Sequence, residues 1–187
     1  MVINGVGKVG TGLVRHLVEE RAHVTVADIR RQAVDRVVTD FGVDAVPWEK
    51  AHAADCDVYA PCALGGSLNP TTIPEMRCAA VVGAANNQLA DPTCADQLGA
   101  AGVLYAPDFV VNAGGVINIA GELGPRGYHR ERAYAQVRGI FDTTRAVIAT
   151  AETKGITTAA AADQLAEERM ARLGHVRLIR TFTEGGR

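Results

Sequence analysis

Hydrophobic residues in the first 110 positions form short continuous runs, and longer stretches of mixed polarity separate one run from the next. Within most runs the apolar side chains follow one another without alternation, which is typical of strands buried on both faces. Such strands occur in parallel sheets that helices cover on both sides. We therefore expect strands at residues 1–4, 23–28, 44–46, 57–62, 79–83 and 103–105.

The stretches between the first runs have helical periodicity. Val9, Leu13 and Leu17 recur every four residues and predict one apolar face on a helix that continues to about Arg21. Residues 30–41 predict a second helix with its own apolar stripe, made of Ala33, Val34, Val37 and Val38. The alternation of strands and helices predicts an α/β fold built on a doubly wound, mostly parallel sheet.

The last third of the chain has a helical pattern only. An apolar stripe predicts a helix over residues 128–154 that Gly155 ends, and Thr157 or Thr158 can cap a further helix to about residue 173. The predicted organisation is a sheet domain over 1–123, a helical extension packed on or beside it over 124–173, and a disordered tail over 174–187.

Composition narrows the functional classes. With 48% apolar residues, 21% charged residues and a net charge of −2, the chain matches neither a disordered protein nor a polybasic nucleic-acid binder. No apolar window of about twenty residues predicts a membrane span, and we expect no secretory signal. The histidines are scattered, so no metal site is expected. The cysteines lack C-x-x-C spacing and indicate a reduced, cytoplasmic protein: Cys56, Cys62, Cys78 and Cys94.

A glycine-rich turn follows the first predicted strand and opens the first predicted helix. Its sequence, GVGKVG at residues 5–10, matches G-x-G-x-x-G. Gly5 permits a tight turn, Gly7 lets the backbone approach a pyrophosphate, and Gly10 allows the helix to pack closely on the sheet. Asp28 follows Gly10 by 18 residues at a strand end, where an acid accepts hydrogen bonds from a ribose. The pattern predicts a dinucleotide site.

A structural turn followed by an acid that caps the next helix is the alternative interpretation of these residues. The context of strand, turn, helix and acid favours the dinucleotide. The charge of Asp28 should repel a 2′-phosphate, so we predict that NAD binds more tightly than NADP. Arg30 and Arg31 count against this selectivity, because adjacent arginines can accept the additional phosphate.

Three further segments, residues 60–66, 83–89 and 105–117, follow later strands and are rich in small residues and asparagine. In a doubly wound fold these positions gather at the ligand-binding edge of the sheet. Small residues leave room for a flat nicotinamide, and asparagine amides can bond its carboxamide or a substrate carboxylate. Taken singly, each segment also suits an ordinary turn.

Taken together, these segments resemble the dinucleotide-binding domain of the leucine, phenylalanine and valine dehydrogenases, within the wider glutamate dehydrogenase family. The resemblance covers about residues 2–173, and its wording is most similar to actinobacterial valine and phenylalanine dehydrogenases. The blocks that carry it are GVGKVG, YAPCALGG, GAANNQLADP, YAPDFVVNAGGVIN, GYHRERA and AAADQLAEERM.

The resemblance implies a Rossmann-like domain and NAD-dependent oxidative deamination of an apolar L-amino acid to its 2-oxo acid and ammonia, together with the reverse reaction. By position, the residues implied for the cofactor are Gly5, Gly7, Lys8, Val9 and Gly10 at the pyrophosphate, Asp28 and Ile29 at the adenosine ribose, Pro61, Cys62 and Ala63 along the adenine-to-ribose stretch, and Ala85, Asn86 and Asn112 near the nicotinamide. The side-chain pocket of the substrate is assigned to Asn112, Val116 and Ile119, with plain core packing as the alternative for the last two.

In the family a separate N-terminal substrate domain carries the catalytic lysine and aspartate. The chain has three lysines, Lys8, Lys50 and Lys154, and none lies in a glycine-rich catalytic setting. Asp96 and Asp108 do not occupy the family's catalytic position, and Asp108 is expected to cap a turn. We therefore expect about half of a two-domain dehydrogenase, with NAD binding but no catalysis. A non-catalytic NAD-binding module is the alternative.

The joint before the C-terminal helices departs from the family pattern at Gly121 and at residues 124–126. We expect the apolar stripes of these helices to be partly exposed, because in the family they pack toward the substrate domain. A second copy of the chain and that N-terminal domain stay open as partners, and the small-molecule partner is the amino acid or 2-oxo acid.

Overall fold

The computed structural model describes residues 1–124 and 127–174. Six strands form one sheet, every neighbouring pair is parallel, and the order is β3-β2-β1-β4-β5-β6. This is the doubly wound, Rossmann-like arrangement that the strand–helix alternation predicts. The strands are β1 (Val2–Asn4), β2 (Thr25–Ala27), β3 (Asp44–Ala45), β4 (Val58–Pro61), β5 (Ala80–Val81) and β6 (Leu104–Tyr105).

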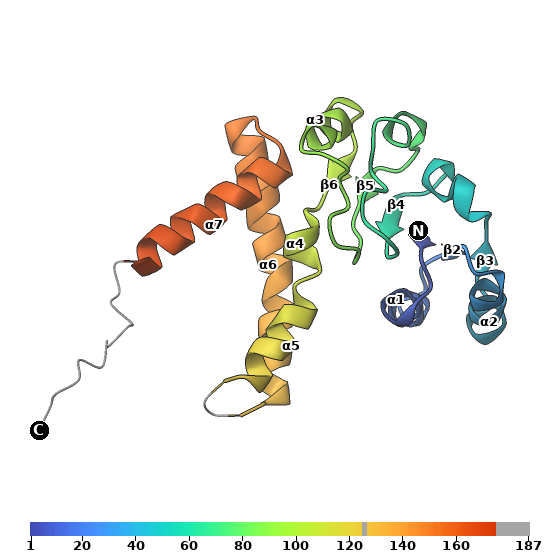
Figure 1. The fold of residues 1–187 in the computed structure, drawn as a ribbon, viewed down its shortest axis with the longest axis horizontal. Helices are drawn as coiled ribbons and strands as arrows, with labels where there is room; N and C mark the ends of the chain where they lie inside the picture. Colours follow the sequence, from blue (N-terminus) through green and yellow to red (C-terminus); the bar gives the residue numbers. More distant parts are fainter. Residues whose placement is uncertain (125–126, 175–187) are drawn as a thin grey trace, which may run out of the picture.

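Helical elements cover both faces of the sheet. Two helices, α1 (Lys8–Glu19) and α2 (Arg31–Phe41), lie on one face, while the short 3-10 helices η1 (Trp48–Ala53) and η2 (Ile73–Glu75) lie with α3 (Thr93–Ala100) on the other (Figure 1). Each face therefore has its own apolar core. The first contains Ile3, Val14, Val26 and Val37, and the second contains Ala51, Tyr59, Cys94 and Leu98.

The predicted apolar stripe of α1 is wrong at one position. Val9 is 62% exposed, whereas Gly10 and Val14 are buried and Leu13 and Leu17 pack partly against the core. The inward face of α1 thus begins at Gly10. Successive residues of a helix are rotated by about 100° around its axis, so Val9, next to Gly10, lies outside the buried face. Val9 is left at the open end of the first turn.

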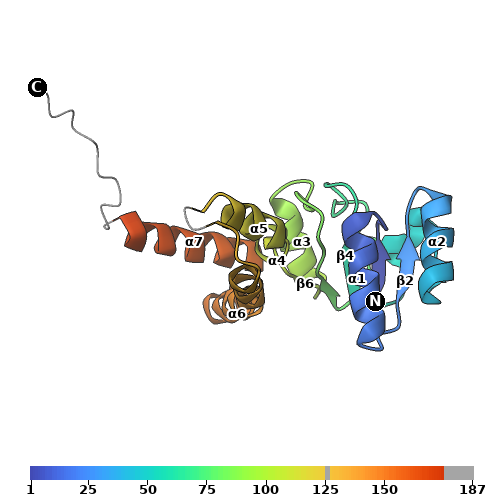
Figure 2. The ribbon, with the colours of Figure 1, turned by 90° about the horizontal axis from the view of Figure 1, so that it is seen from below.

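The C-terminal helices pack beside the β6 edge of the sheet. After α4 (Asp108–Val111) and α5 (Gly114–Glu122), the long helix α6 (Arg130–Lys154) is followed by α7 (Thr158–Gly174) (Figure 2). Gly155, at a φ of 64°, ends α6 as predicted, and Thr157 caps α7 by accepting a hydrogen bond from the Ala160 N–H at 3.2 Å. The predicted tail beyond Gly174 lies outside the described residues.

The C-terminal helices pack against each other, and a hydrogen bond from the start of α7 ties them to the end of β6. Val147 and Ala151 of α6 bury themselves against Ala161 and Ala162 of α7. The Thr158 hydroxyl donates a hydrogen bond to the Tyr105 carbonyl oxygen at the end of β6. Other apolar side chains stay exposed, as the sequence predicts for this part of the chain: Leu123, Tyr134, Val137, Phe141 and Met170. Within the described residues, no helix combines the length and apolarity that crossing a membrane requires.

Candidate functional site

The carboxyl ends of β1 and β4 lie side by side at the centre of the sheet. The chain leaves β1 toward α1 on one face and leaves β4 toward η2 on the opposite face. The divergence of the two connections marks the topological switch point of the sheet, and open α/β sheets bind ligands at this position. The glycine-rich turn and the 60–66 segment both lie here.

Gly5 and Gly10 are required by close backbone packing. Gly5 has a φ of +110°, and a Cβ on it would lie 2.7 Å from the Ala63 nitrogen and the Cys62 carbonyl carbon. Its own N–H donates to the Ala27 carbonyl oxygen at 2.7 Å. A Cβ on Gly10 would overlap the Gly5 carbonyl oxygen. These two glycines therefore bring α1, β1 and the segment after β4 into contact.

Gly7 differs from the other two glycines. Its φ of −71° suits any residue, and a Cβ built on it meets no atom within 4 Å. Gly7 precedes α1, and its carbonyl oxygen accepts the first helical hydrogen bond, from the Thr11 N–H at 2.9 Å. The N–H groups of the first turn, before Thr11, are consequently without intrahelical acceptors, and no side chain caps them.

The start of α1 thus has the properties of an anion site. Free N–H groups and the positive end of the helix dipole point outward over an open surface at Gly7, with Lys8 exposed beside them. The space beyond Gly7 is what a pyrophosphate needs in order to approach the backbone. The residues present therefore fit a dinucleotide at this turn.

Asp28 is held at the end of β2 by two backbone N–H groups. The Val6 N–H donates to its Oδ2 and the Arg30 N–H donates to its Oδ1, each at 2.9 Å. The Arg30 side chain adds two bonds, from Nε to Oδ1 at 3.1 Å and from Nη2 to Oδ2 at 3.2 Å. Burial opposes ionisation, but these hydrogen bonds outweigh it and hold the pKa of Asp28 below its ordinary value. The neighbouring Ile29 is 75% exposed.

The segments after β4 and β5 are tied to each other through Pro61. Its carbonyl oxygen accepts a hydrogen bond from the Ala85 N–H at 2.9 Å, and a Cβ on Gly83 would overlap the same oxygen. The Cys62 N–H donates to the Asn4 carbonyl oxygen at 2.7 Å. Burial raises the pKa of the Cys62 thiol, which keeps it protonated and argues against a nucleophilic role.

Two asparagines that the sequence assigns to the nicotinamide side meet across 26 residues of chain. The Asn112 side-chain amide donates to Asn86 Oδ1 at 2.7 Å and to the Ala85 carbonyl oxygen at 3.5 Å. This contact joins the end of α4 to the segment after β5. Ala85, Asn86 and Asn112 therefore form one group, connected through Pro61 to the group around the glycine-rich turn.

Gln88, which no sequence argument selected, supports that group from inside. It is fully buried, and its amide nitrogen donates to the Gly83 and Ala85 carbonyl oxygens at 2.9 and 3.0 Å. Its backbone N–H donates to Asp108 Oδ2 at 2.9 Å, and Asp108 also accepts from the Phe109 N–H. The signal that could have revealed it is the single long polar side chain in the segment 83–89, whose other residues are small, asparagine or leucine.

Two of the three predicted substrate-pocket residues lie on α5, and the third, Asn112, follows α4. Val116 is 70% exposed and Ile119 is 56% exposed, and all nine residues of α5 are exposed or half-buried. Neither side chain is packed in a core of the described residues, and the assignment of this pair to the substrate pocket stays a prediction.

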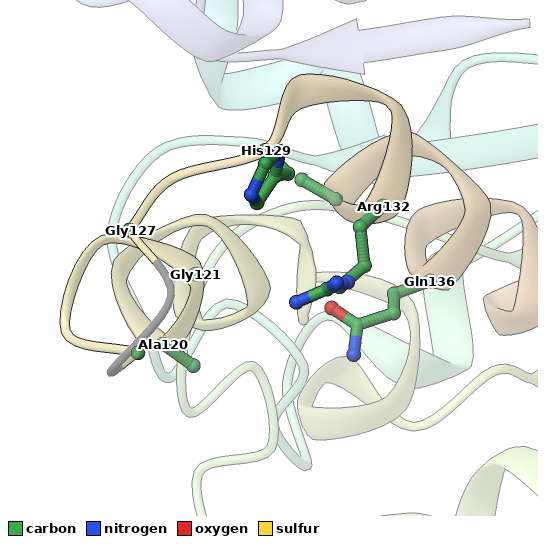
Figure 3. A pocket seen from close by; sticks show the side chains of 8 residues that line it. Ala120, Gly121, Gly127, His129, Arg132 and Gln136 are labelled. Atoms are coloured by element: carbon green, nitrogen blue, oxygen red, sulfur yellow. The ribbon is translucent and has the colours of Figure 1, made fainter.

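A separate cavity of about 220 Å³ lies between the end of α5 and the first turns of α6 (Figure 3). His129, Arg132 and Gln136 line its α6 side, and Ala120 and Gly121 line its α5 side. None of the residues that the sequence assigns to cofactor or substrate is among its lining residues.

Comparison with known proteins assigns the chain to a family. The family model for glutamate/leucine/phenylalanine/valine dehydrogenases matches residues 27–177. The chain belongs to this family. This match confirms the resemblance of the sequence blocks to the family. The family consists of oxidoreductases that act on amino acids.

Individual relatives agree with this assignment. The chain is 47% identical over 173 residues to the leucine dehydrogenase of Bacillus subtilis and 50% identical over 173 residues to the valine dehydrogenase of Streptomyces coelicolor. The alignments cover 92% and 90% of the chain but 47% of each relative, so the chain spans about half the length of the curated relatives it matches. The crystal structure of L-tryptophan dehydrogenase from Nostoc punctiforme superposes with a TM-score of 0.88 at 41% identity, covering 91% of this chain and 52% of that one.

Proposed function

We propose that residues 1–123 are the cofactor-binding domain of an NAD-dependent amino-acid dehydrogenase, with residues 124–173 as a helical extension packed beside it. The observation that carries this proposal is the turn before α1. Gly5 and Gly10 are needed for packing, whereas Gly7 leaves an open surface over unpartnered N–H groups at a helix start. A turn that served structure alone would have no use for that open surface.

The role that we propose for each residue follows from its contacts. The N–H groups at Gly7, Lys8 and Val9 bind the pyrophosphate, and Gly5 and Gly10 shape the turn that presents them. Asp28, beside Ile29, accepts hydrogen bonds from the adenosine ribose. Pro61, Cys62 and Ala63 form the wall along the ribose. Ala85, Asn86 and Asn112 orient the nicotinamide, and Gln88 holds their backbone in place from the core.

NAD, when bound, supplies the hydride acceptor for oxidation of the amino acid. In the complete reaction the amino acid, NAD⁺ and water give the 2-oxo acid, ammonium, NADH and a proton. The substrate class we propose is an apolar L-amino acid of the leucine, valine or phenylalanine type. Support comes from the relatives named for leucine and valine and from the exposed side chains of Val116 and Ile119, which are available to line a pocket beside Asn112.

We further propose that these 187 residues bind the cofactor without turning over the substrate. Lys8 lies in the first turn of α1 and Lys50 lies in η1. Lys154, in the last turn of α6, donates to Gln164 Oε1 at 2.8 Å. None of the three is at the nicotinamide group of residues, so the chain offers no lysine to activate water. A catalytic partner, whether another domain or another chain, would supply the acid–base groups. A free-standing NAD-binding module remains the alternative.

Titration of the chain with NADH, followed by fluorescence, tests the binding. Wild type should saturate, and Gly7→Ala should weaken binding at least tenfold while folding normally, because its Cβ enters open space at an ordinary φ. Gly12→Ala, inside α1 and also in open space, is the matched control and should bind like wild type.

An NAD-reduction assay with valine, leucine and phenylalanine at alkaline pH tests the catalytic part. Turnover near ordinary enzyme rates, about 10 s⁻¹, would refute the absence of catalysis. Absence of NADH binding by wild type would refute the proposed function itself.

A further inference from the structure

Arg30 covers the acid at the end of β2. Its guanidinium donates to both oxygens of Asp28, at 3.1 and 3.2 Å. The Arg30 side chain is 64% exposed, whereas the Asp28 side chain is 7% exposed. The guanidinium is therefore the outermost layer over the carboxylate, between Asp28 and solvent.

This cover occupies the positions that a ribose would use. Each carboxylate oxygen already accepts one backbone N–H, from Val6 or from Arg30, and those two bonds are part of the fold. The remaining acceptor positions face outward, and the Arg30 side chain takes them. A ribose diol can bond Asp28 only after this side chain moves away, so the side chain of Arg30 and a ribose compete for the same oxygens.

A basic depression lies next to the cover. It has a volume of about 390 Å³ at the first turn of α2, and its lining residues are Arg30, Arg31, Gln32, Ala33 and Arg36. All three arginines are exposed. An arginine fork binds a phosphate through two parallel hydrogen bonds, and three such side chains around one depression suit a dianion.

We propose that Arg30 is a specificity-determining residue that covers Asp28 in the free protein and turns into this depression to hold the 2′-phosphate of NADP, so that the site accepts NADP alongside NAD. The inference rests on the proposed cofactor function and deepens it. Asp28 alone would repel a 2′-phosphate, but Arg30, Arg31 and Arg36 offset its charge at the same place. Arg30 therefore weakens binding of the ribose of NAD and strengthens binding of the 2′-phosphate of NADP.

Calorimetric titration of the full chain with NADH and with NADPH tests this role. Arg30→Ala should tighten NADH binding about two- to fivefold, which corresponds to removal of one exposed ion pair. The same variant should weaken NADPH binding about tenfold through loss of a charge-assisted contact. Arg36→Ala, which leaves the contact with Asp28 intact, should weaken NADPH binding alone. Arg15→Ala, an exposed arginine of α1, controls for the change in net charge.

The outcomes separate the two proposals. Opposite shifts of the NADH and NADPH affinities in Arg30→Ala, with Arg15→Ala unchanged, support the specificity role. Equal shifts of both affinities, or weakening of NADPH by Arg15→Ala to the same extent, would overturn it while leaving the dinucleotide site in place. If wild type binds neither dinucleotide, the proposed function fails and Arg30 loses its role with it.

Discussion

Gly10→Ala is the substitution whose effect the structure defines most closely. The added Cβ would overlap the Gly5 carbonyl oxygen and lie 3.0 Å from the Gly5 carbonyl carbon. That oxygen cannot move aside alone, because its peptide plane also carries the Val6 N–H, which is bonded to Asp28 Oδ2 at 2.9 Å. Either α1 must shift away from the sheet or the turn between β1 and α1 must change. Both movements disrupt the packing between α1 and the first core.

Two opposing effects set the magnitude. Alanine is favoured over glycine inside a helix by about 1 kcal/mol. Overpacking costs about 1–3 kcal/mol, and the upper end applies because the contact is with backbone rather than with a flexible side chain. The net expected loss is about 2 kcal/mol, a large share of the roughly 5–15 kcal/mol that stabilises a typical domain.

Urea unfolding followed by circular dichroism measures this loss, with Gly12→Ala as the control. The control makes the same chemical change in the same helix, but its Cβ meets no atom within 4 Å. We expect Gly12→Ala to gain up to about 1 kcal/mol, so the two variants should differ by about 3 kcal/mol. If Gly10→Ala is as stable as Gly12→Ala, the close approach of α1 to the Gly5 turn is not a constraint of the fold.

Two further substitutions test the site. Asp28→Asn should reduce stability at neutral pH, because the low pKa of Asp28 means that its carboxylate stabilises the folded state. That contribution is present above the unfolded pKa of about 4 and is lost as the pH falls through the folded value. The difference in stability between wild type and variant should therefore close below about pH 4 in acid-unfolding curves. A gap that widens on acidification would contradict this assignment. Gln88→Glu places a carboxylate against two carbonyl oxygens in the core. It should lower the free energy of unfolding in urea by about 3 kcal/mol or more and weaken NADH binding. The control Gln97→Glu, on α3, should leave NADH binding unchanged. Wild-type NADH affinity in Gln88→Glu would remove the proposed support of the nicotinamide side.

The local features were predictable from sequence because their causes are local. A strand, a G-x-G-x-x-G turn, a helix and Asp28 follow one another within 28 residues, and each has a distinct physical signal. The end of α6 at Gly155 and the cap at Thr157 follow from the same kind of short-range rule.

Elements with weak periodicity were missed. The short helix α3 and the 3-10 helices η1 and η2 span eight, six and three residues, too few for an apolar stripe to repeat. The segment 105–117, described from the sequence only as a ligand-binding segment after a strand, contains α4 and the start of α5. The sequence pattern places Val9 in the buried stripe of α1, but the inward position is Gly10. A glycine has no apolar side chain, so the pattern does not reveal it.

Long-range contacts were out of reach for a different reason. The Asn112–Asn86 bond and the bond between Gln88 and Asp108 join residues 20 or more positions apart, and they depend on how β5 and β6 align in the sheet. The pair of Arg30 and Asp28 is close in sequence, but its effect depends on which acceptor positions the backbone has already filled. A pattern of residue types does not contain that information.

A crystal structure of the chain with NADH tests the central claim most directly. We predict that the pyrophosphate lies against the N–H groups at Gly7, Lys8 and Val9, that the adenosine ribose bonds Asp28, and that Arg30 has left the carboxylate. A dinucleotide bound elsewhere, for example in the cavity between α5 and α6 near Arg132, with the turn at Gly7 bare, would contradict the account.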